Sequence, residues 1–84
     1  MDEIKKLLGS DKLLLGTDRT MKAVKKGTID KVFLSKNVSS EVKEDVEHYK
    51  ELSSFNVEHV ALTNEELGTL CRKSFPISVI GILK

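Results

Sequence analysis

Short apolar runs alternate with segments of helical periodicity along the whole chain, and this alternation constrains the fold more than any other feature. The runs are bounded by charges or turn formers and are rich in branched and aromatic side chains, as strands are: 12–16, 31–35, 57–62 and 77–83. Strands that alternate with helices predict an α/β fold, a three-layer α/β/α sandwich around a small four-stranded mixed sheet in the order αβαβαβαβ. A chain of 84 residues has room for one modest core, so we expect 1–84 to form a single domain.

The segments between these runs have recognisable helix ends. Thr17 is a candidate N-cap of the second helix and Gly27 its C-terminal stop, while Ser39 or Ser40 is expected to cap the third. The sequence TNEE at 63–66 is a capping box that opens the fourth. The expected helices are Met1–Leu8, Thr17–Lys26, Glu41–Leu52 and about 63–70.

Charge is unevenly distributed, although the net charge is only +1. From Met1 to Lys36, nine Lys or Arg stand against five Asp or Glu, whereas from Asn37 to Leu62 two stand against six. Such asymmetry can concentrate a positive field on one face of the protein. Ordinary solvated helix surfaces explain it as well, so charge alone leaves both interpretations open.

Several classes of function are disfavoured by what the sequence contains. A single cysteine, Cys71, an acidic start and the lack of an apolar run of about 20 residues predict a cytoplasmic protein without a membrane partner. His48, His59 and Cys71 share no local metal-ligand spacing, and no nucleophile or phosphate-cradling motif is present. We therefore expect no metal, no cofactor and no enzymatic activity, and a monomer as the simplest state.

The stretch GTDRTMKAVKKG, 16–27, combines a close-approach glycine with a basic helix start. Arg19, Lys22 and Lys26 fall at i, i+3 and i+7 and so form one stripe on the expected helix. A helix start presents free N–H groups, and Arg can bond guanine O6 and N7 together, so the pattern suits phosphates and guanine edges. The alternative is a helix face that lysines merely keep soluble.

The stretch LGTLCRKSFPISVIGIL, 67–83, places a mixed loop between a helix end near Cys71 and a buried strand. Its loop, Arg72–Ile77, holds two cations, a serine, an aromatic ring and a proline. Because Pro76 fixes the turn next to it, the ring of Phe75 is a candidate for stacking on an unpaired base. Burial of the same ring under the loop is the alternative.

Together the two stretches resemble the kink-turn RNA-binding ribosomal protein family. That family includes archaeal and eukaryotic large-subunit ribosomal proteins and small bacterial relatives of the YbxF and YlxQ type. GTDRTMKAVKKG is similar to its helix-start signature, and the LG, C, S and P of the second stretch are similar to its specificity loop. The resemblance covers nearly the whole chain and implies an RNA-binding protein that recognises a kink-turn or similar internal loop, ribosomal or ribosome-associated.

The resemblance also assigns residues to the RNA. Asp18 and Arg19 stand where the family has Asn and Glu on tandem sheared G·A pairs, and Lys22 stands where a lysine reaches a guanine edge. Asn37 and Ser39 fall in a loop that touches a flipped-out nucleotide in relatives. The expected RNA-binding residues are Gly16, Thr17, Asp18, Arg19, Lys22, Lys26, Asn37, Ser39, Arg72, Lys73, Ser74, Phe75, Pro76 and Ile77.

Asp18 and Arg19 depart from the family pattern in their chemistry. The Asp18 carboxylate cannot donate a hydrogen bond to guanine O6 as Asn can, and Arg19 places a donor where Glu would accept.

A rival hypothesis is a protein-interaction module on the same fold, in which the acidic helix Glu41–Glu51 meets a basic partner.

Overall fold

The computed structural model describes residues 2–84, with side chains from residue 4 onward. Met1, which the predicted first helix included, lies outside the described residues. The element order is αβαβαβαβ, as predicted. The bounds are α1 (Asp2–Leu7), β1 (Leu13–Leu15), α2 (Thr17–Lys26), β2 (Ile29–Leu34), α3 (Ser40–Leu52), β3 (Asn56–His59), α4 (Asn64–Leu70) and β4 (Val79–Leu83).

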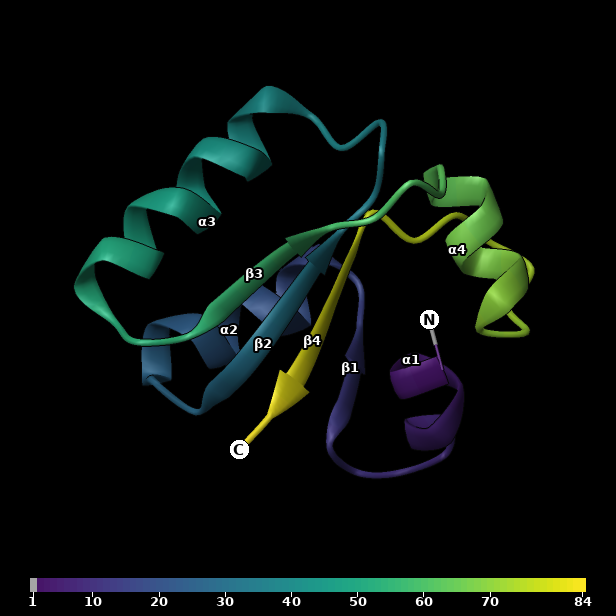
Figure 1. Cartoon of the computed structure of the whole chain (residues 1–84), viewed down its shortest axis with the longest axis horizontal. Coiled ribbons are helices and arrows are strands. Elements are labelled where there is room, and N and C mark those ends of the chain that lie inside the picture. Colours follow the sequence, from purple (N-terminus) through teal and green to yellow (C-terminus); the bar gives the residue numbers. More distant parts are fainter. Residues whose placement is uncertain (1) are drawn as a thin grey trace.

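The strands form one mixed sheet in the order β1-β4-β2-β3 (Figure 1). β4 runs antiparallel to both of its neighbours, with Ile80 opposite Leu15 of β1 and opposite Phe33 of β2. β2 and β3 are parallel, with Val32 opposite Val57, and α3 provides the crossover between them. β4 and the second half of β2, residues 32–34, read as continuous apolar runs because both of their faces are covered.

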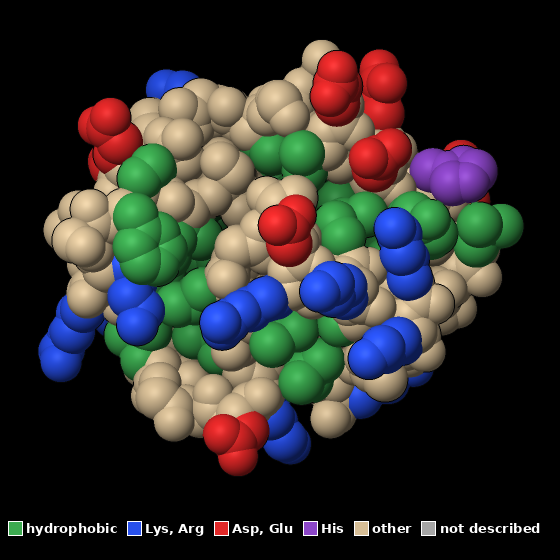
Figure 2. All heavy atoms as spheres, turned by 180° about the vertical axis from the view of Figure 1, so that it is seen from behind, with side chains coloured by type: hydrophobic (Ala, Val, Ile, Leu, Met, Phe, Trp, Pro, Cys, Tyr) green, Lys and Arg blue, Asp and Glu red, His purple; other side chains and the backbone are tan. Residues whose placement is uncertain are grey.

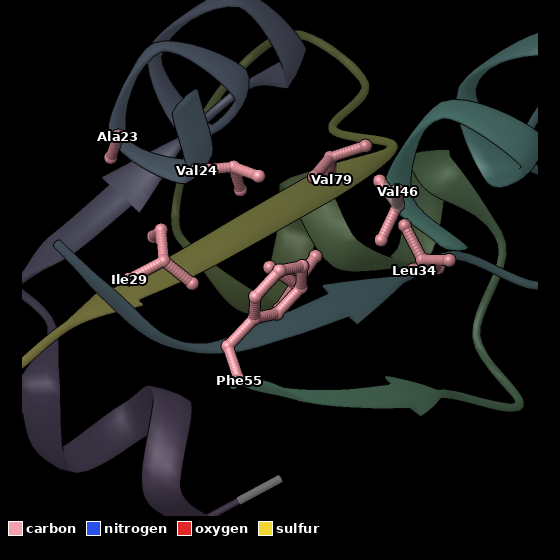
Figure 3. Close-up of a cluster of buried hydrophobic side chains, with 8 residues drawn as sticks. Ala23, Val24, Ile29, Leu34, Val46, Phe55 and Val79 are labelled. Atoms are coloured by element: carbon pink, nitrogen blue, oxygen red, sulfur yellow. The ribbon is translucent and has the colours of Figure 1, made fainter. Parts of the chain in front are cut away.

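Two buried clusters, one on each face of the sheet, make the protein a three-layer sandwich. On one face, Val24 of α2 and Val46 of α3 join Val32, Leu34 and Val79 of the central strands (Figure 3). The opposite face carries α1 and α4, whose buried residues meet the alternate positions of the same strands: Ile4, Phe33, Leu67, Cys71, Ile77, Ile80 and Ile82. Side chains that alternate along β2 and β4 therefore hold both helical layers.

The helix α2 lies unusually close to the sheet at one point. A Cβ built on Gly81 of β4 would come within 2.8 Å of the Thr20 Cγ2 atom and 2.9 Å of the Ile29 Cδ1 atom. Thr20 is fully buried there, and its hydroxyl has no hydrogen-bond partner within the described structure. Because Gly81 has no side chain, α2 can pack directly against β4, and this contact sets the distance between the basic helix and the sheet.

Helix ends follow the predictions at most positions and depart at one. The capping box at Thr63 and Glu66 is present, Ser39 caps α3, and Gly27 ends α2 in the left-handed conformation (φ 75°). Thr17 is not the N-cap of α2: that position is Gly16, with φ 110° and ψ 155°. A β-carbon disfavours this conformation, so the chain uses glycine there and forgoes a capping side chain.

Strand ends differ from the predictions because pairing partners, and not apolar runs, decide them. The run 57–62 ends as a strand at His59, since its partner β2 ends at Leu34. The run 77–83 enters the sheet only at Val79, whereas β2 begins at Ile29, two residues before its run.

Among the described residues, no helix combines the length and apolarity needed to cross a membrane.

Candidate nucleic-acid interface

The start of α2 is an open helix terminus. Gly16 accepts the first helical bond from the Thr20 N–H group (3.2 Å), but no side chain caps the helix. The Gly16 N–H group donates to the carbonyl oxygen of Val79 (2.9 Å), which ties this turn to the first residue of β4. The first-turn N–H groups of α2 thus lie beside the point where the α4–β4 loop enters the sheet, and they favour a negatively charged ligand.

The outer face of α2 is basic. Arg19, Lys22, Lys25 and Lys26 are exposed, whereas the opposite side buries Thr20, Ala23 and Val24 against the sheet. Figure 2 shows this face, with Lys and Arg side chains gathered across its middle over α2 and acidic side chains along its upper right. Asp18, also exposed, is the acidic residue in the first turn of the helix. The predicted stripe therefore faces solvent, on a helix whose opposite side packs against the sheet.

The α4–β4 loop, residues 71–78, is held against α4 by backbone hydrogen bonds. The Lys73 N–H group donates to the Gly68 carbonyl (2.8 Å), and the Arg72 N–H group donates to the Thr69 carbonyl (3.0 Å). Arg72 adopts the left-handed conformation (φ 59°), which turns the chain back along the helix. Phe75 then passes so close to α4 that its carbonyl oxygen occupies the space of a Cβ at Gly68. The loop consequently packs against α4 and presents a defined outer surface.

Most of the predicted loop residues face outward. The ring of Phe75 is 53% exposed, so it is not buried under the loop. Ile77 differs: its side chain is 1% exposed and packs with the apolar cluster that α4 covers. Ile77 is therefore a core residue rather than a surface for a base. The exposed members of the loop are Arg72, Lys73, Ser74, Phe75 and Pro76.

Asn37 and Ser39, predicted on the loop between β2 and α3, are exposed but already have structural partners. The Asn37 Nδ2 group donates to Asn64 Oδ1 (3.0 Å), and the Asn64 N–H group donates to Asn37 Oδ1 (2.8 Å). The Ile77 N–H group in turn donates to the Asn64 carbonyl (2.9 Å), so Asn64 connects this loop to the α4–β4 loop. Ser39 Oγ accepts the Val42 N–H bond that caps α3.

A single open hollow joins the two stretches that the sequence analysis singled out. Its volume is about 840 Å³, and Arg19 of α2 lines it together with Arg72, Lys73 and Phe75 of the α4–β4 loop. Other parts of its lining come from residues that sequence reasoning missed: Leu8, Gly9, Ser10, Leu13 and Leu15. These residues read as helix end, turn and strand, and no local pattern marks them as surface-forming. Ser74 and Pro76 line a separate, smaller recess with Phe75 and Lys73.

The thiol and the two imidazoles do not form a reactive group. Burial raises the pKa of the Cys71 thiol, although Lys73 acts in the opposite direction, so the thiol stays protonated at neutral pH. His48 makes an edge-to-face contact with Tyr49 on α3, whereas His59 ends β3. Within residues 4–84, no cluster of His, Cys, Asp and Glu side chains is arranged to hold a metal ion.

Comparison with known proteins gives a consistent result. The sequence model of the ribosomal protein L7Ae/L30e/S12e/Gadd45 family matches residues 1–84. Large ribosomal subunit protein eL30 of Sulfolobus acidocaldarius is 38% identical over 81 residues, 96% of this chain and 78% of the relative. The eL30 protein of Methanocaldococcus jannaschii is 36% identical over 80 residues, 95% of this chain and 73% of the relative.

Two solved structures share the fold. One is a protein with unknown function from Bacillus halodurans, with a TM-score of 0.84 and 23% identity over 96% of this chain and 80% of that one. The other is the 15.5kD RNA binding protein of Giardia lamblia, with a TM-score of 0.77 and 18% identity over 96% of this chain and 68% of that one. At these identities the likeness is one of architecture.

Proposed function

The chain belongs to the ribosomal protein L7Ae/L30e/S12e/Gadd45 family, which confirms the resemblance seen in the sequence, and on this basis we propose that it binds RNA. The RNA contains a kink-turn or a similar internal loop and belongs to the ribosome or to a ribosome-associated particle. Support comes from relatives that are large-subunit ribosomal proteins and from a neighbour of the same architecture that is an RNA binding protein. The role is one of binding rather than catalysis, exercised in the cytoplasm.

One observation carries the proposal: Arg19 of α2 lines the same hollow as Arg72, Lys73 and Phe75 of the α4–β4 loop. Arg19 and Arg72, more than 50 residues apart in the sequence, meet there because β1 pairs with β4 and the Gly16 N–H group donates to the Val79 carbonyl at the start of β4. A cationic helix start next to an exposed aromatic ring combines phosphate binding with base stacking, the two interactions that irregular RNA requires.

Each side chain has a role that its chemistry allows. Arg19 and Lys22, three residues apart on the exposed face of α2, donate to guanine O6 and N7 in the groove. Lys26, Arg72 and Lys73 neutralise phosphates, and Phe75 stacks on an unpaired base. Gly16 and Thr17 allow close approach of the RNA. Asp18, which can only accept, is suited to an amino group of a base rather than to O6.

A second candidate function rests on the exposed acidic surface of α3. The side chains of Glu44, Asp45, Glu47 and Glu51 face solvent, and Leu52 at the end of the helix is 69% exposed. Apolar surface at the end of an acidic helix suits contact with a basic protein. The two functions separate by mutation, since RNA binding depends on α2 and protein binding on α3.

Substitutions of two lysines on α2 test the proposed function. Lys22→Ala should weaken binding of an internal-loop RNA by about 1–3 kcal/mol, the usual value of a base-edge contact. Lys26→Ala should weaken the binding of all RNAs about equally. It should also reduce the slope of log affinity against log salt concentration by about the amount expected for one phosphate contact. Lys43→Ala, an exposed lysine on α3, is the matched control.

The affinities would be measured by fluorescence anisotropy over a range of salt concentrations. Unchanged RNA affinity in both α2 variants would refute the assignment of this face. If those variants bind RNA normally while Glu44→Lys abolishes binding of a basic protein, the α3 function would replace it.

A further inference from the structure

Backbone hydrogen bonds join three segments of the chain at the end of the sheet where β2 and β3 stop and β4 begins (Figure 1). The Ser35 N–H group donates to the Ser78 carbonyl (2.9 Å), which extends the pairing of β2 with β4 by one step. The Lys36 N–H group donates to the Leu62 carbonyl (2.7 Å) on the segment between β3 and α4. The next connection along the chain, at Asn37, is made by a side chain.

The Asn37 side chain caps α4 although it lies 27 residues away in the sequence. Asn64 is the first residue of α4, and the N–H group at this position of a helix has no partner within the helix. It donates to Asn37 Oδ1 (2.8 Å) instead. The capping box of Thr63 and Glu66, by contrast, bonds two N–H groups of the same helix start to each other's side chains. The start of α4 is therefore attached to the end of β2 by the Asn37 side chain.

A second hydrogen bond between the same two residues follows from the first. Because a backbone N–H group can only donate, the Asn37 amide must turn its oxygen toward the Asn64 backbone. Its nitrogen then faces the Asn64 side chain, where Oδ1 accepts the hydrogen bond from Nδ2 (3.0 Å). Two bonds between one pair of residues fix their relative position and orientation more narrowly than a single bond does.

The α4–β4 loop is attached to α4 at two places. The Ile77 N–H group donates to the Asn64 carbonyl (2.9 Å) at the start of the helix, and the Lys73 N–H group donates to the Gly68 carbonyl (2.8 Å) nearer its end. Residues 74–76, all exposed, lie between these two attachments. A change in the position of α4 therefore moves this exposed part of the loop with it.

We propose that Asn37 and Asn64 are positioning residues for RNA binding. Asn37 holds the start of α4 in place, Asn64 passes that position on to the α4–β4 loop, and Asn37 acts on the RNA through this pair rather than by touching it. The inference rests on the proposed RNA binding. It replaces the role that the family resemblance implied for Asn37, a contact with a flipped-out nucleotide, because both the oxygen and the nitrogen of this amide already bond to Asn64.

The first test needs no RNA and measures amide hydrogen exchange of the free protein by NMR. Asn37→Ala should speed exchange at Ile77, 40 residues away, at least about five-fold more than at Ser53, whose amide is bonded at the end of α3. Thr28→Ala removes a side-chain hydrogen bond just before β2 and is the control, which should leave this ratio unchanged. An Asn37→Ala protein with the same ratio as the unmodified chain would overturn the inference.

The second test is a double-mutant cycle on the affinity for an internal-loop RNA, with variants that urea unfolding shows to be folded. Asn64→Ala removes the acceptor of the Asn37 Nδ2 group but keeps the backbone N–H group that bonds Asn37 Oδ1. It should weaken binding at least about three-fold in the unmodified chain and have no further effect in Asn37→Ala, since the two residues act through one contact. Thr28→Ala should bind the RNA as the unmodified chain does.

The outcomes of the cycle separate positioning from direct contact and from the proposed function itself. If Asn64→Ala weakens binding by the same factor in both backgrounds, or if only Asn37→Ala weakens it, the pair does not act as a unit and the inference is refuted. If both asparagine variants bind normally while Lys22→Ala binds weakly, RNA binding stands and the inference is again refuted. If the unmodified chain binds no RNA, the proposed function falls and the role of the pair in RNA binding falls with it.

Discussion

The carbonyl oxygen of Phe75 occupies the space in which residue 68 would carry a Cβ, so the α4–β4 loop can lie on α4 only because that residue is glycine. A helix interior normally disfavours glycine by about 1 kcal/mol relative to alanine. The chain accepts this cost, and the position of the exposed Phe75 ring follows from it. Gly68 is thus a positioning residue for the candidate interface.

Gly68→Ala should therefore destabilise the protein and weaken RNA binding. Overlap with backbone atoms of Phe75 cannot be relieved by a side-chain rotation, and overpacking of this kind costs about 1–3 kcal/mol, more than the gain in helix propensity. Thr69→Ala, an exposed neighbour on the same helix, is the control and should change both quantities little. Urea unfolding and RNA titration of the two variants would check this, and a Gly68→Ala protein with normal RNA affinity would contradict it.

Arg72 should show a conflict between stability and function. Its left-handed conformation (φ 59°) costs an L-residue about 1 kcal/mol, whereas glycine adopts it freely. Arg72→Gly should raise the free energy of unfolding by up to about 1 kcal/mol and at the same time weaken RNA binding, since a cation is lost. Arg72→Ala removes the same charge and keeps the strain, so it should bind as weakly without the added stability. Equal stabilities of the two variants would contradict the argument.

Acid should loosen α4 through Glu66. The backbone N–H group of Thr63 donates to the Glu66 carboxylate (3.1 Å), and this bond, followed by the Thr63 hydroxyl and Lys36, lowers the pKa of Glu66. Because the pKa is lower in the folded than in the unfolded state, the stabilisation is complete above the unfolded value, about 4.3, and is lost as the pH falls through the folded value.

The Glu66→Gln variant should therefore be less stable than the unmodified protein at about pH 6, and the difference should shrink as the pH falls toward about 3. Glu65→Gln removes a charge from the same helical turn without touching the capping box and serves as the control. Urea midpoints at the two pH values measure the effect. A difference between Glu66→Gln and the unmodified protein that stays constant with pH would contradict the assignment.

Local patterns predicted those features of the fold that depend on a few neighbouring residues. The capping box at 63–66 and the glycine stop at Gly27 could be predicted because the end of a helix depends on residues within one turn of it. The prediction of Thr17 as the N-cap of α2 was wrong. Threonine is a common N-cap residue, but the N-cap here is Gly16, whose positive φ favours glycine. The strand after Phe55 was overextended because its length depends on β2, a partner more than 20 residues away.

The candidate interface was predictable in its charged half and not in its apolar half. Arg19 and Lys22 announce an exposed face by their helical spacing, and their placement on α2 is as expected. Leu13 and Leu15 read as ordinary strand residues, and only the folded chain shows that they line one hollow together with residues of the α4–β4 loop. Ile77 was expected at the RNA from the family resemblance, whereas its side chain is 1% exposed and packs in the apolar cluster that α4 covers.

The central claim is that this chain recognises a kinked internal loop in RNA, and a titration with a standard kink-turn RNA at about 0.1 M salt tests it most directly. The control RNA has its tandem G·A pairs replaced by Watson–Crick pairs. We predict that the kink-turn RNA binds at least about ten-fold more tightly than the control, because Arg19 and Lys22 contact guanine edges exposed only in the kinked form. Equal affinity for the two RNAs, or no binding to either, would contradict the claim.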